Sequence, residues 1–175
     1  LAVVGHVPGG LGYVAIMAAV ILAAVSGSAV ADAAALASLL LPMMVAAGHD
    51  KARSAGLIAS AGIIAPVIPP SIGFVIFGVA ANVSISKLFL AGIVPGVLLG
   101  IALAITWWWL VRSEKVAPPA RASRAEVLKA LRESVWALGL PVIILVGLRM
   151  GVFTPTEAAV VAAVYALFVA MVVYR

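Results

Sequence analysis

The sequence predicts an all-α integral membrane protein that contains a re-entrant helical hairpin and a discontinuous transmembrane helix. Hydrophobic residues make up 66% of the 175-residue chain and charged residues only 10%, whereas soluble domains are roughly 45–50% apolar. Long apolar runs alternate with short basic segments. Two of the apolar runs are interrupted by Gly and Ser or by Pro, which indicates helices broken inside the membrane.

The composition also excludes several functional classes. The chain has no cysteine and two histidines, so disulfides, thiol catalysis and Cys-ligated metal sites are excluded and no zinc site is expected. The net charge of +5 lies mostly between apolar runs, where it orients the protein in a lipid bilayer. We expect no nucleic-acid partner. The chain opens at Leu1 without a Met and has no basic flank before its first apolar run, and it ends at Arg175 directly after another apolar run. We therefore expect an internal fragment of a longer protein.

Residues 1–50 are expected to form the re-entrant hairpin. Its first apolar limb, residues 11–25, would be roughly 22 Å long as a helix, which is short of the roughly 30 Å hydrocarbon core. The second limb, residues 33–48, is of similar length. The tip between the limbs contains Ser26, Gly27 and Ser28. Two ordinary spans joined by a tight polar turn are the alternative.

Residues 51–87 are expected to form the discontinuous helix. Residues 54–86 contain no charge and would make a helix of roughly 50 Å, too long for one straight span. Proline lacks the amide hydrogen and clashes with the preceding turn, so Pro66, Pro69 and Pro70 should divide the segment. The Pro69-Pro70 pair should unwind the middle, and Ser71 should begin a second half-helix.

Three segments complete the predicted architecture. Residues 88–111 form a full span that ends in three tryptophans, as is typical of the membrane interface. Residues 112–134 form a polar cytoplasmic connecting arm, in which residues 125–136 have the pattern of an amphipathic helix on the membrane surface. Residues 135–175 contain two further transmembrane helices. Thr154 and Glu157, between these helices, have the spacing of a capping box.

The basic residues predict how the spans are oriented. Nine of the eleven Lys and Arg can be placed on one side, leaving Lys87 and Arg149 opposite. The nine are Lys51, Arg53, Arg112, Lys115, Arg121, Arg124, Lys129, Arg132 and Arg175. The positive-inside rule makes their side cytoplasmic. The same placement requires both ends of the hairpin to lie on the cytoplasmic side.

The first interruption carries candidate ligands for a cation. Ser26, Gly27 and Ser28 would supply hydroxyl and carbonyl oxygens, which suit sodium. The alternative is that these small residues only permit close helix packing. Asp32 is the one acid deep in the apolar sequence. It either helps to hold the cation or anchors the hairpin through hydrogen bonds.

The second interruption carries candidate ligands for an anionic substrate. Ser71 follows Pro69 and Pro70 at the start of a half-helix, and the positive end of a helix favours an anion. A simple proline kink is the alternative. Paired interruptions near the midplane are typical of secondary transporters. A membrane aspartyl protease would need a second carboxylate near Asp32, and no other apolar run contains one, so we predict no enzyme.

Four strings in the sequence resemble a known family. SGSAVADAAAL at 26–36, PVIPPS at 66–71, FLAGIVPG at 89–96 and GVFTPTEAA at 151–159 are similar to the large membrane subunit of tripartite ATP-independent periplasmic (TRAP) transporters. The resemblance implies a multi-pass permease of the bacterial inner membrane, with an elevator-type transport domain. It implies sodium-driven import of an organic acid such as a C4-dicarboxylate, without a cofactor.

The resemblance also implies two protein partners and leaves two alternatives. The partners are a small TRAP membrane subunit and a periplasmic binding protein that delivers the substrate. A stand-alone sodium–carboxylate symporter would use the same chemistry without the binding protein. A non-transporting structural membrane subunit is the alternative from a different class.

Overall fold

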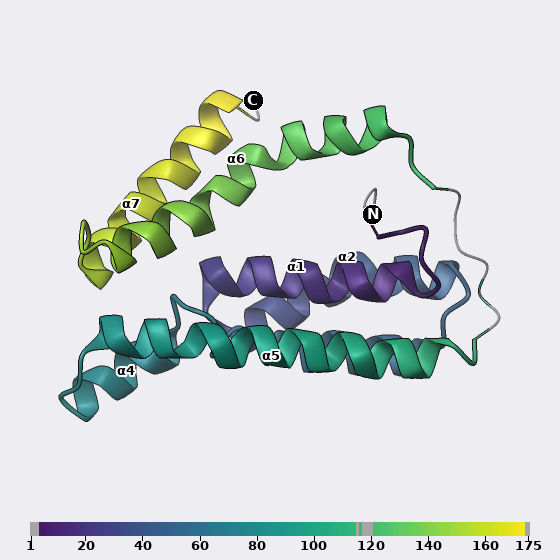
Figure 1. Cartoon of the computed structure of the whole chain (residues 1–175), viewed down its shortest axis with the longest axis horizontal. Helices are drawn as coiled ribbons and strands as arrows, with labels where there is room; N and C mark the ends of the chain where they lie inside the picture. Colours follow the sequence, from purple (N-terminus) through teal and green to yellow (C-terminus); the bar gives the residue numbers. More distant parts are fainter. Residues whose placement is uncertain (1–3, 115, 117–120, 174–175) are drawn as a thin grey trace.

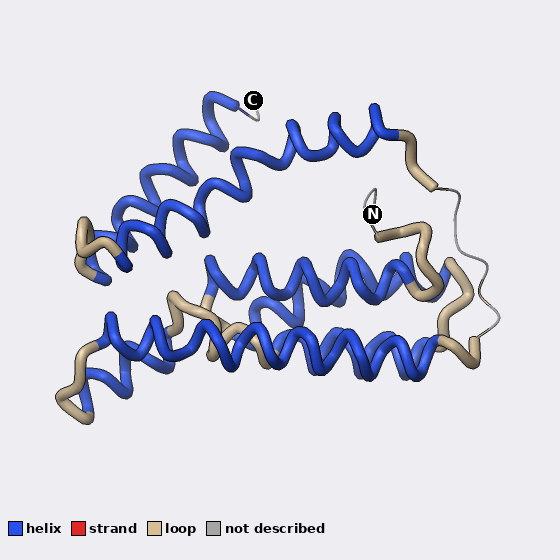
Figure 2. The backbone as a smooth tube through the Cα atoms, viewed as in Figure 1, coloured by secondary structure: helices blue, strands red, loops and turns tan. Residues whose placement is uncertain are grey.

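The computed structural model describes residues 4–114, 116 and 121–173, and every regular element in these residues is helical (Figure 2). The elements are α1 (Gly10–Ser26), α2 (Ala29–Ala46), α3 (Lys51–Gly62), α4 (Ile72–Ala80), α5 (Ile85–Val111), α6 (Arg124–Arg149), α7 (Pro155–Phe168) and the π-helical turn η1 (Val169–Val173). Predictions that used Lys115 and Arg175 fall outside the described residues.

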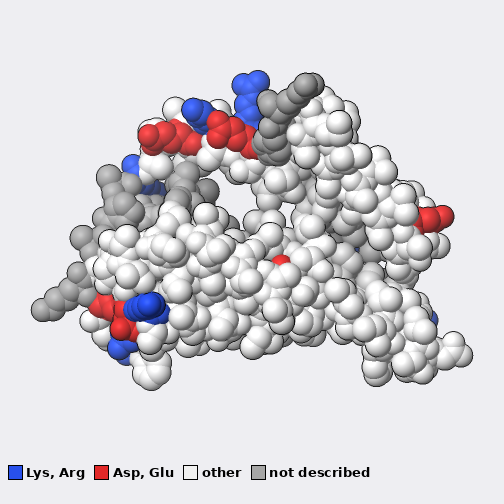
Figure 3. Space-filling view, turned by 180° about the vertical axis from the view of Figure 1, so that it is seen from behind, with Lys and Arg blue, Asp and Glu red and all other residues white. Residues whose placement is uncertain are grey.

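Four of the described helical segments are long and apolar enough to cross a membrane. They are α2, α5, α6 and α7 together with η1. Figure 3 shows a broad surface on which one small acidic spot is the only charge near the centre, with the other acidic and basic groups of the described residues gathered near its margins. The predicted class of all-α membrane protein is therefore confirmed. Whether α1 and α2 re-enter the membrane from one side stays a prediction at this point.

The α1–α2 hairpin turns at Gly27, which has a left-handed φ of +61°. The Gly27 amide donates to the Ala23 carbonyl oxygen at 3.3 Å and so closes the end of α1. Ser28 then begins α2, because its hydroxyl accepts from the Ala31 amide at 3.4 Å. This cap starts α2 earlier than the expected limb at residue 33. Asp32 consequently lies in the first turn of a helix and not in a loop.

The second interruption separates α3 from α4, as the prolines predict. Residues 63–70 form turns and bends, and Ser71 is the N-cap of α4. The Ser71 hydroxyl accepts from the Phe74 amide at 3.3 Å and donates to the Pro66 carbonyl oxygen at 2.6 Å. One side chain therefore starts the second half-helix and holds the broken segment against it.

The structure differs from the prediction for the connecting arm. α6 runs without interruption from Arg124 to Arg149, so the expected boundary at residue 134 lies inside one helix. Ser123 and Glu126 form a capping box that starts α6, and residues 125–138 contain no glycine or proline to end it. Pro141 lies within the helix, which bends along its length in Figure 1. The predicted capping box of Thr154 and Glu157 is confirmed at the start of α7.

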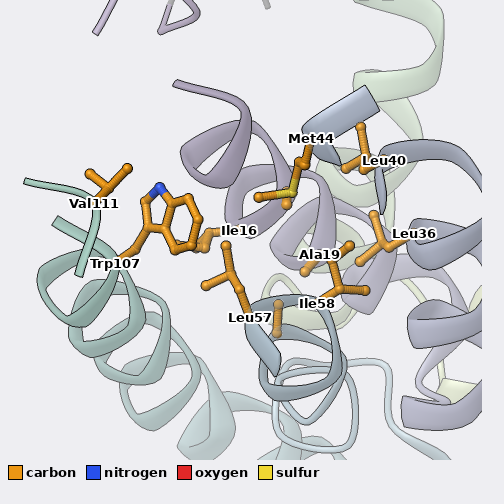
Figure 4. Packing of buried hydrophobic residues seen from close by; sticks show 11 residues of the cluster. Ile16, Ala19, Leu36, Leu40, Met44, Leu57, Ile58, Trp107 and Val111 are labelled. Carbon is orange, nitrogen blue, oxygen red and sulfur yellow. The ribbon is translucent and has the colours of Figure 1, made fainter. Parts of the chain in front are cut away.

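The main core lies where α1, α2, α3 and α5 pack together (Figure 4). Trp107 is fully buried there, and its indole Nε1–H donates to the Gly9 carbonyl oxygen at 2.8 Å. The prediction of an interfacial belt is therefore wrong for Trp107. Successive residues point about 100° apart on an α-helix, so the three tryptophans cannot share one face. Trp108 and Trp109 are exposed beside the Arg112 guanidinium.

An ion-pair cluster ties the open end of the hairpin to the end of α5. His49 Nδ1 lies 2.7 Å from Glu114 Oε2, and Arg53 Nη1 donates to Glu114 Oε1 at 3.3 Å. The α2–α3 turn and the end of α5 thus lie together, whereas the α4–α5 and α6–α7 turns lie at the opposite end (Figure 1). This arrangement agrees with the grouping of charges made above. The membrane side that each end faces stays a prediction.

Candidate functional site

The two interruptions of the apolar runs meet in space. A Cβ atom placed on Gly27 would lie 2.6 Å from the Pro70 carbonyl oxygen and 3.0 Å from Ser71 Cα. These separations are too short for any side chain, and the left-handed backbone of Gly27 disfavours one as well. The tip of the α1–α2 hairpin therefore packs directly against the break between α3 and α4.

Ser26 and Asp32 form a hydrogen-bonded pair beside this contact. The Ser26 hydroxyl donates to Asp32 Oδ1 and accepts from the Ser28 amide at 3.1 Å. Asp32 is only 3% exposed. Its other oxygen, Oδ2, is buried and has no hydrogen-bond partner among the described residues. A buried carboxylate oxygen without a partner is energetically unfavourable unless another group compensates it, so Oδ2 is a candidate cation ligand.

The Ser71 side chain is not free to bind a ligand, and the residue contributes to the candidate site by fixing the start of α4. Its hydroxyl already bonds to Pro66 and to Phe74, and the residue is 1% exposed. The cap leaves the first amides of α4 without intrahelical partners. Because the helix dipole adds positive potential at this end, the start of α4 can attract an anionic group.

A cavity of about 280 Å³ lies at this meeting point. Its polar lining comes from Ser26 and Ser71, and most of its remaining lining is apolar. The cavity is lined by Val25, Ser26, Pro70, Ser71, Ile72, Val75 and Phe89, and by Ile144, Leu148, Pro155, Ala158, Ala159 and Ala162 from α6 to α7. An apolar pocket with a few polar groups is the usual form of a small-molecule site.

Four of the seven predicted site residues do not line this cavity, namely Gly27, Ser28, Asp32 and Pro69. Gly27 and Asp32 lie beside it, at the contact described above. Ser28 is occupied as the cap of α2, and Pro69 is fully buried and lines a different cavity. Sequence reasoning also missed the α6–α7 side of the cavity. The apolar residues there carry no local signal of which cavity they line, since only tertiary packing brings them to Ser26 and Ser71.

Comparisons with known proteins identify the family. The model of the family described as "Tripartite ATP-independent periplasmic transporter, DctM component" matches residues 1–175. The chain belongs to this family. The resemblance found in the sequence motifs is thus confirmed.

Several curated relatives are similar over nearly the whole chain. The 2,3-diketo-L-gulonate TRAP transporter large permease protein YiaN of Escherichia coli K12 is 58% identical over 172 residues, which cover 98% of this chain and 40% of YiaN. The C4-dicarboxylate TRAP transporter large permease protein DctM of Pseudomonas aeruginosa is 46% identical, with 99% and 41% covered. The sialic acid TRAP transporter large permease protein SiaM of Vibrio cholerae is 45% identical, with 98% and 40% covered.

The chain spans about 40% of the length of these DctM-family relatives. Family membership and the four candidate spans make it a multi-pass protein of the bacterial inner membrane. The relatives are transporter permeases and not enzymes, so the prediction that this chain is not an enzyme is confirmed.

Proposed function

We propose that this chain forms part of the ion and substrate site of a sodium-coupled secondary transporter that imports an organic acid. The observation that carries the proposal is the contact of the hairpin tip at Gly27 with the break at Pro70 and Ser71, beside buried Asp32. Broken helices at membrane depth are stable when protein covers them or when they line a cavity. Paired breaks of this kind form the binding sites of secondary transporters.

Sodium is the coupling ion that the available oxygen atoms favour. Ser26 Oγ and both Asp32 carboxylate oxygens belong to one cluster, and the Pro70 carbonyl lies against the adjacent Gly27. Neutral oxygens and one carboxylate match the charge of a monovalent cation. Several carboxylates, by contrast, are typical of divalent cation sites. This donor set supports sodium at the tip, with Asp32 as both anchor and ligand.

The substrate is assigned to the class of carboxylates. The relatives named above are a diketo-gulonate, a C4-dicarboxylate and a sialic acid transporter, and all three kinds of substrate are organic acids. The start of α4 at Ser71 borders the cavity, and its positive end favours a carboxylate. We propose a small TRAP membrane subunit and a periplasmic binding protein as partners, because the family is that of a tripartite periplasmic transporter.

The length of α1 and its place beside α5 support a re-entrant hairpin, in which α2 is the returning limb. α1 has 17 residues and α5 has 27, or roughly 26 Å and 40 Å of helix. In Figure 1, α1 begins beside the C-terminal end of α5 and ends short of the N-terminal end of α5. Both limbs would therefore enter and leave on one side. The shared core of α1, α2, α3 and α5 supports their movement as one body in an elevator-type cycle.

Uptake into proteoliposomes tests the proposal. The complete transporter would be offered a panel of carboxylates, including a C4-dicarboxylate and sialic acid, with an inward gradient of sodium or of potassium. We expect uptake of at least one acid only with the sodium gradient and only with the matching periplasmic binding protein. Sodium-driven uptake without the binding protein would favour the stand-alone symporter. Equal uptake under both gradients would contradict sodium coupling.

A further inference from the structure

A hollow made of two adjoining cavities follows the face of α6 that is turned toward α1. Its mouth is a cavity of about 480 Å³ lined by His6, Arg121, Ala122, Arg124, Val127, Leu128 and Leu131. Val127 and Leu131 also line a second cavity, which is bounded across the gap by α1. Figure 3 shows an opening between the upper layer, formed by α6 and α7, and the rest of the molecule. We call this feature, from Arg121 to Leu138, the α6 groove.

The mouth of the α6 groove is basic and carries unpaired polar groups. Arg121 and Arg124 form no ion pair with a described residue. Glu126, the nearest acid along the chain, is bound to the Ser123 amide at 2.7 Å in the capping box. His6 Nδ1 is buried and has no hydrogen-bond partner among the described residues. These three side chains therefore favour an anion at this point.

Beyond its mouth the groove is almost entirely apolar. Val14, Met17 and Ile21 of α1 face Val127, Leu131 and Leu138 of α6 across it. Arg124 and Leu138 belong to one helix and are roughly 21 Å apart along its axis, at about 1.5 Å per residue. This depth is close to one leaflet of a bilayer that measures about 40–45 Å with its headgroups.

We infer that the α6 groove binds an anionic phospholipid. The phosphate lies between Arg121 and Arg124 with His6 as a further donor, and an acyl chain follows Val127 and Leu131 toward Leu138. A soluble anion would leave the apolar part of the groove unfilled, and an apolar protein helix would leave the two arginines and the His6 nitrogen unpaired. Basic pockets beside transmembrane helices on the cytoplasmic side have this affinity for anionic headgroups.

Photocrosslinking with a lipid probe tests the inference. The complete transporter would be reconstituted with phosphatidylglycerol that carries a diazirine on its acyl chain, and adducts would be mapped by mass spectrometry. We expect adducts on the segments that hold Val127 to Leu138 and Val14 to Ile21. The paired change Arg121→Gln and Arg124→Gln should lower their yield by about thirtyfold, since each of the two basic residues contributes on the order of 1 kcal/mol near an anionic lipid and about 1.4 kcal/mol corresponds to tenfold.

Matched variants distinguish lipid binding in the α6 groove from a general effect of positive charge on α6. Lys129→Gln with Arg132→Gln removes the same charge from α6 at positions that do not line the groove, and should leave the adduct yield unchanged. Leu131→Trp fills the groove, keeps both arginines and should also lower the yield. A further measurement compares labelling of the wild type by phosphatidylglycerol and by phosphatidylcholine. This comparison and Leu131→Trp test the inference even if the arginine variant fails to fold.

Four outcomes would overturn the inference. Equal labelling by photoreactive phosphatidylcholine would show that the anionic headgroup is not recognised. Loss of labelling in millimolar inorganic phosphate would indicate a site for a soluble anion. An unchanged adduct yield in the folded arginine variant would show that Arg121 and Arg124 do not bind the headgroup. The absence of lipid adducts on α1 and α6 would indicate that another protein segment fills the groove.

Discussion

Gly27 is the single residue on which the contact between the two interruptions depends most directly. An added Cβ would meet the Pro70 carbonyl at 2.6 Å, and the backbone is left-handed. Gly27→Ala should therefore destabilise the protein by about 1–3 kcal/mol and strongly reduce uptake. Thermal unfolding of the purified permease and uptake into proteoliposomes measure the two effects.

Gly56 offers a matched control for Gly27. It lies within α3, and a Cβ placed on it meets nothing within 4 Å. Gly56→Ala should be neutral or should stabilise the helix by roughly 0.5–1 kcal/mol. If the two variants had the same stability and transport activity, the close approach of Gly27 to the Pro70 carbonyl would not matter for folding or transport.

Local chemistry explains which residues the sequence could predict. A Gly between two Ser residues predicted the turn at Gly27, and a double proline predicted that Ser71 would begin a helix. The bond from Ser26 to Asp32 needed more information, because the cap at Ser28 decides where the first turn of α2 places Asp32. The pairing of His49 with Glu114 joins distant segments, and nothing in either segment indicates the other.

At the scale of elements, the break between α3 and α4 is the most informative target. The paired change Pro69→Ala and Pro70→Ala restores two backbone donors and favours continuous helix by roughly 3 kcal/mol per proline in an interior position. Continuous helix would consume the carbonyls and amides proposed to face the ion and substrate. We expect a folded protein in the membrane that has lost sodium-coupled uptake.

Pro42 provides the control for this element. It lies inside α2 and is exposed, away from the break. Pro42→Ala removes a helix-interior proline without changing the candidate site, so transport should persist. Near-normal uptake by a well-expressed double variant at Pro69 and Pro70 would show that the break is only a kink.

The elements were predicted best where a residue with strong backbone preferences marks a boundary. Proline and glycine defined the ends of α1 and α3, and Thr154 with Glu157 defined the start of α7. The boundary expected at residue 134 relied on a change from amphipathic to apolar pattern, and no helix ends there. Such a change alters what a helix faces but does not end it, and α6 continues through it.

At the scale of the whole molecule, the arrangement of the helix ends predicts the topology. Ser113 lies beside Glu114 at the end of α5, and Ser84 is the exposed cap at its start. In a form of the complete permease without other reactive thiols, Ser113→Cys should react with a membrane-impermeant maleimide only from the cytoplasmic side. Ser84→Cys should react only from the periplasmic side. The reverse pattern would contradict the orientation drawn from charge.

Direct binding of radioactive sodium to the purified complete transporter tests the central claim, a sodium site where the hairpin tip meets the broken helix. Asp32→Asn keeps an oxygen that can accept from Ser26 but removes the charge, so it separates anchoring from ion binding. Ser38→Ala is the control, because the Ser38 hydroxyl lies on the same helix and, among the described residues, bonds only to the Ala35 carbonyl oxygen at 2.9 Å. We predict that Asp32→Asn and Ser26→Ala each weaken sodium binding by about tenfold or more, or roughly 1.4 kcal/mol, and that Ser38→Ala binds sodium normally. Wild-type sodium affinity in folded Asp32→Asn and Ser26→Ala variants would contradict the proposed site.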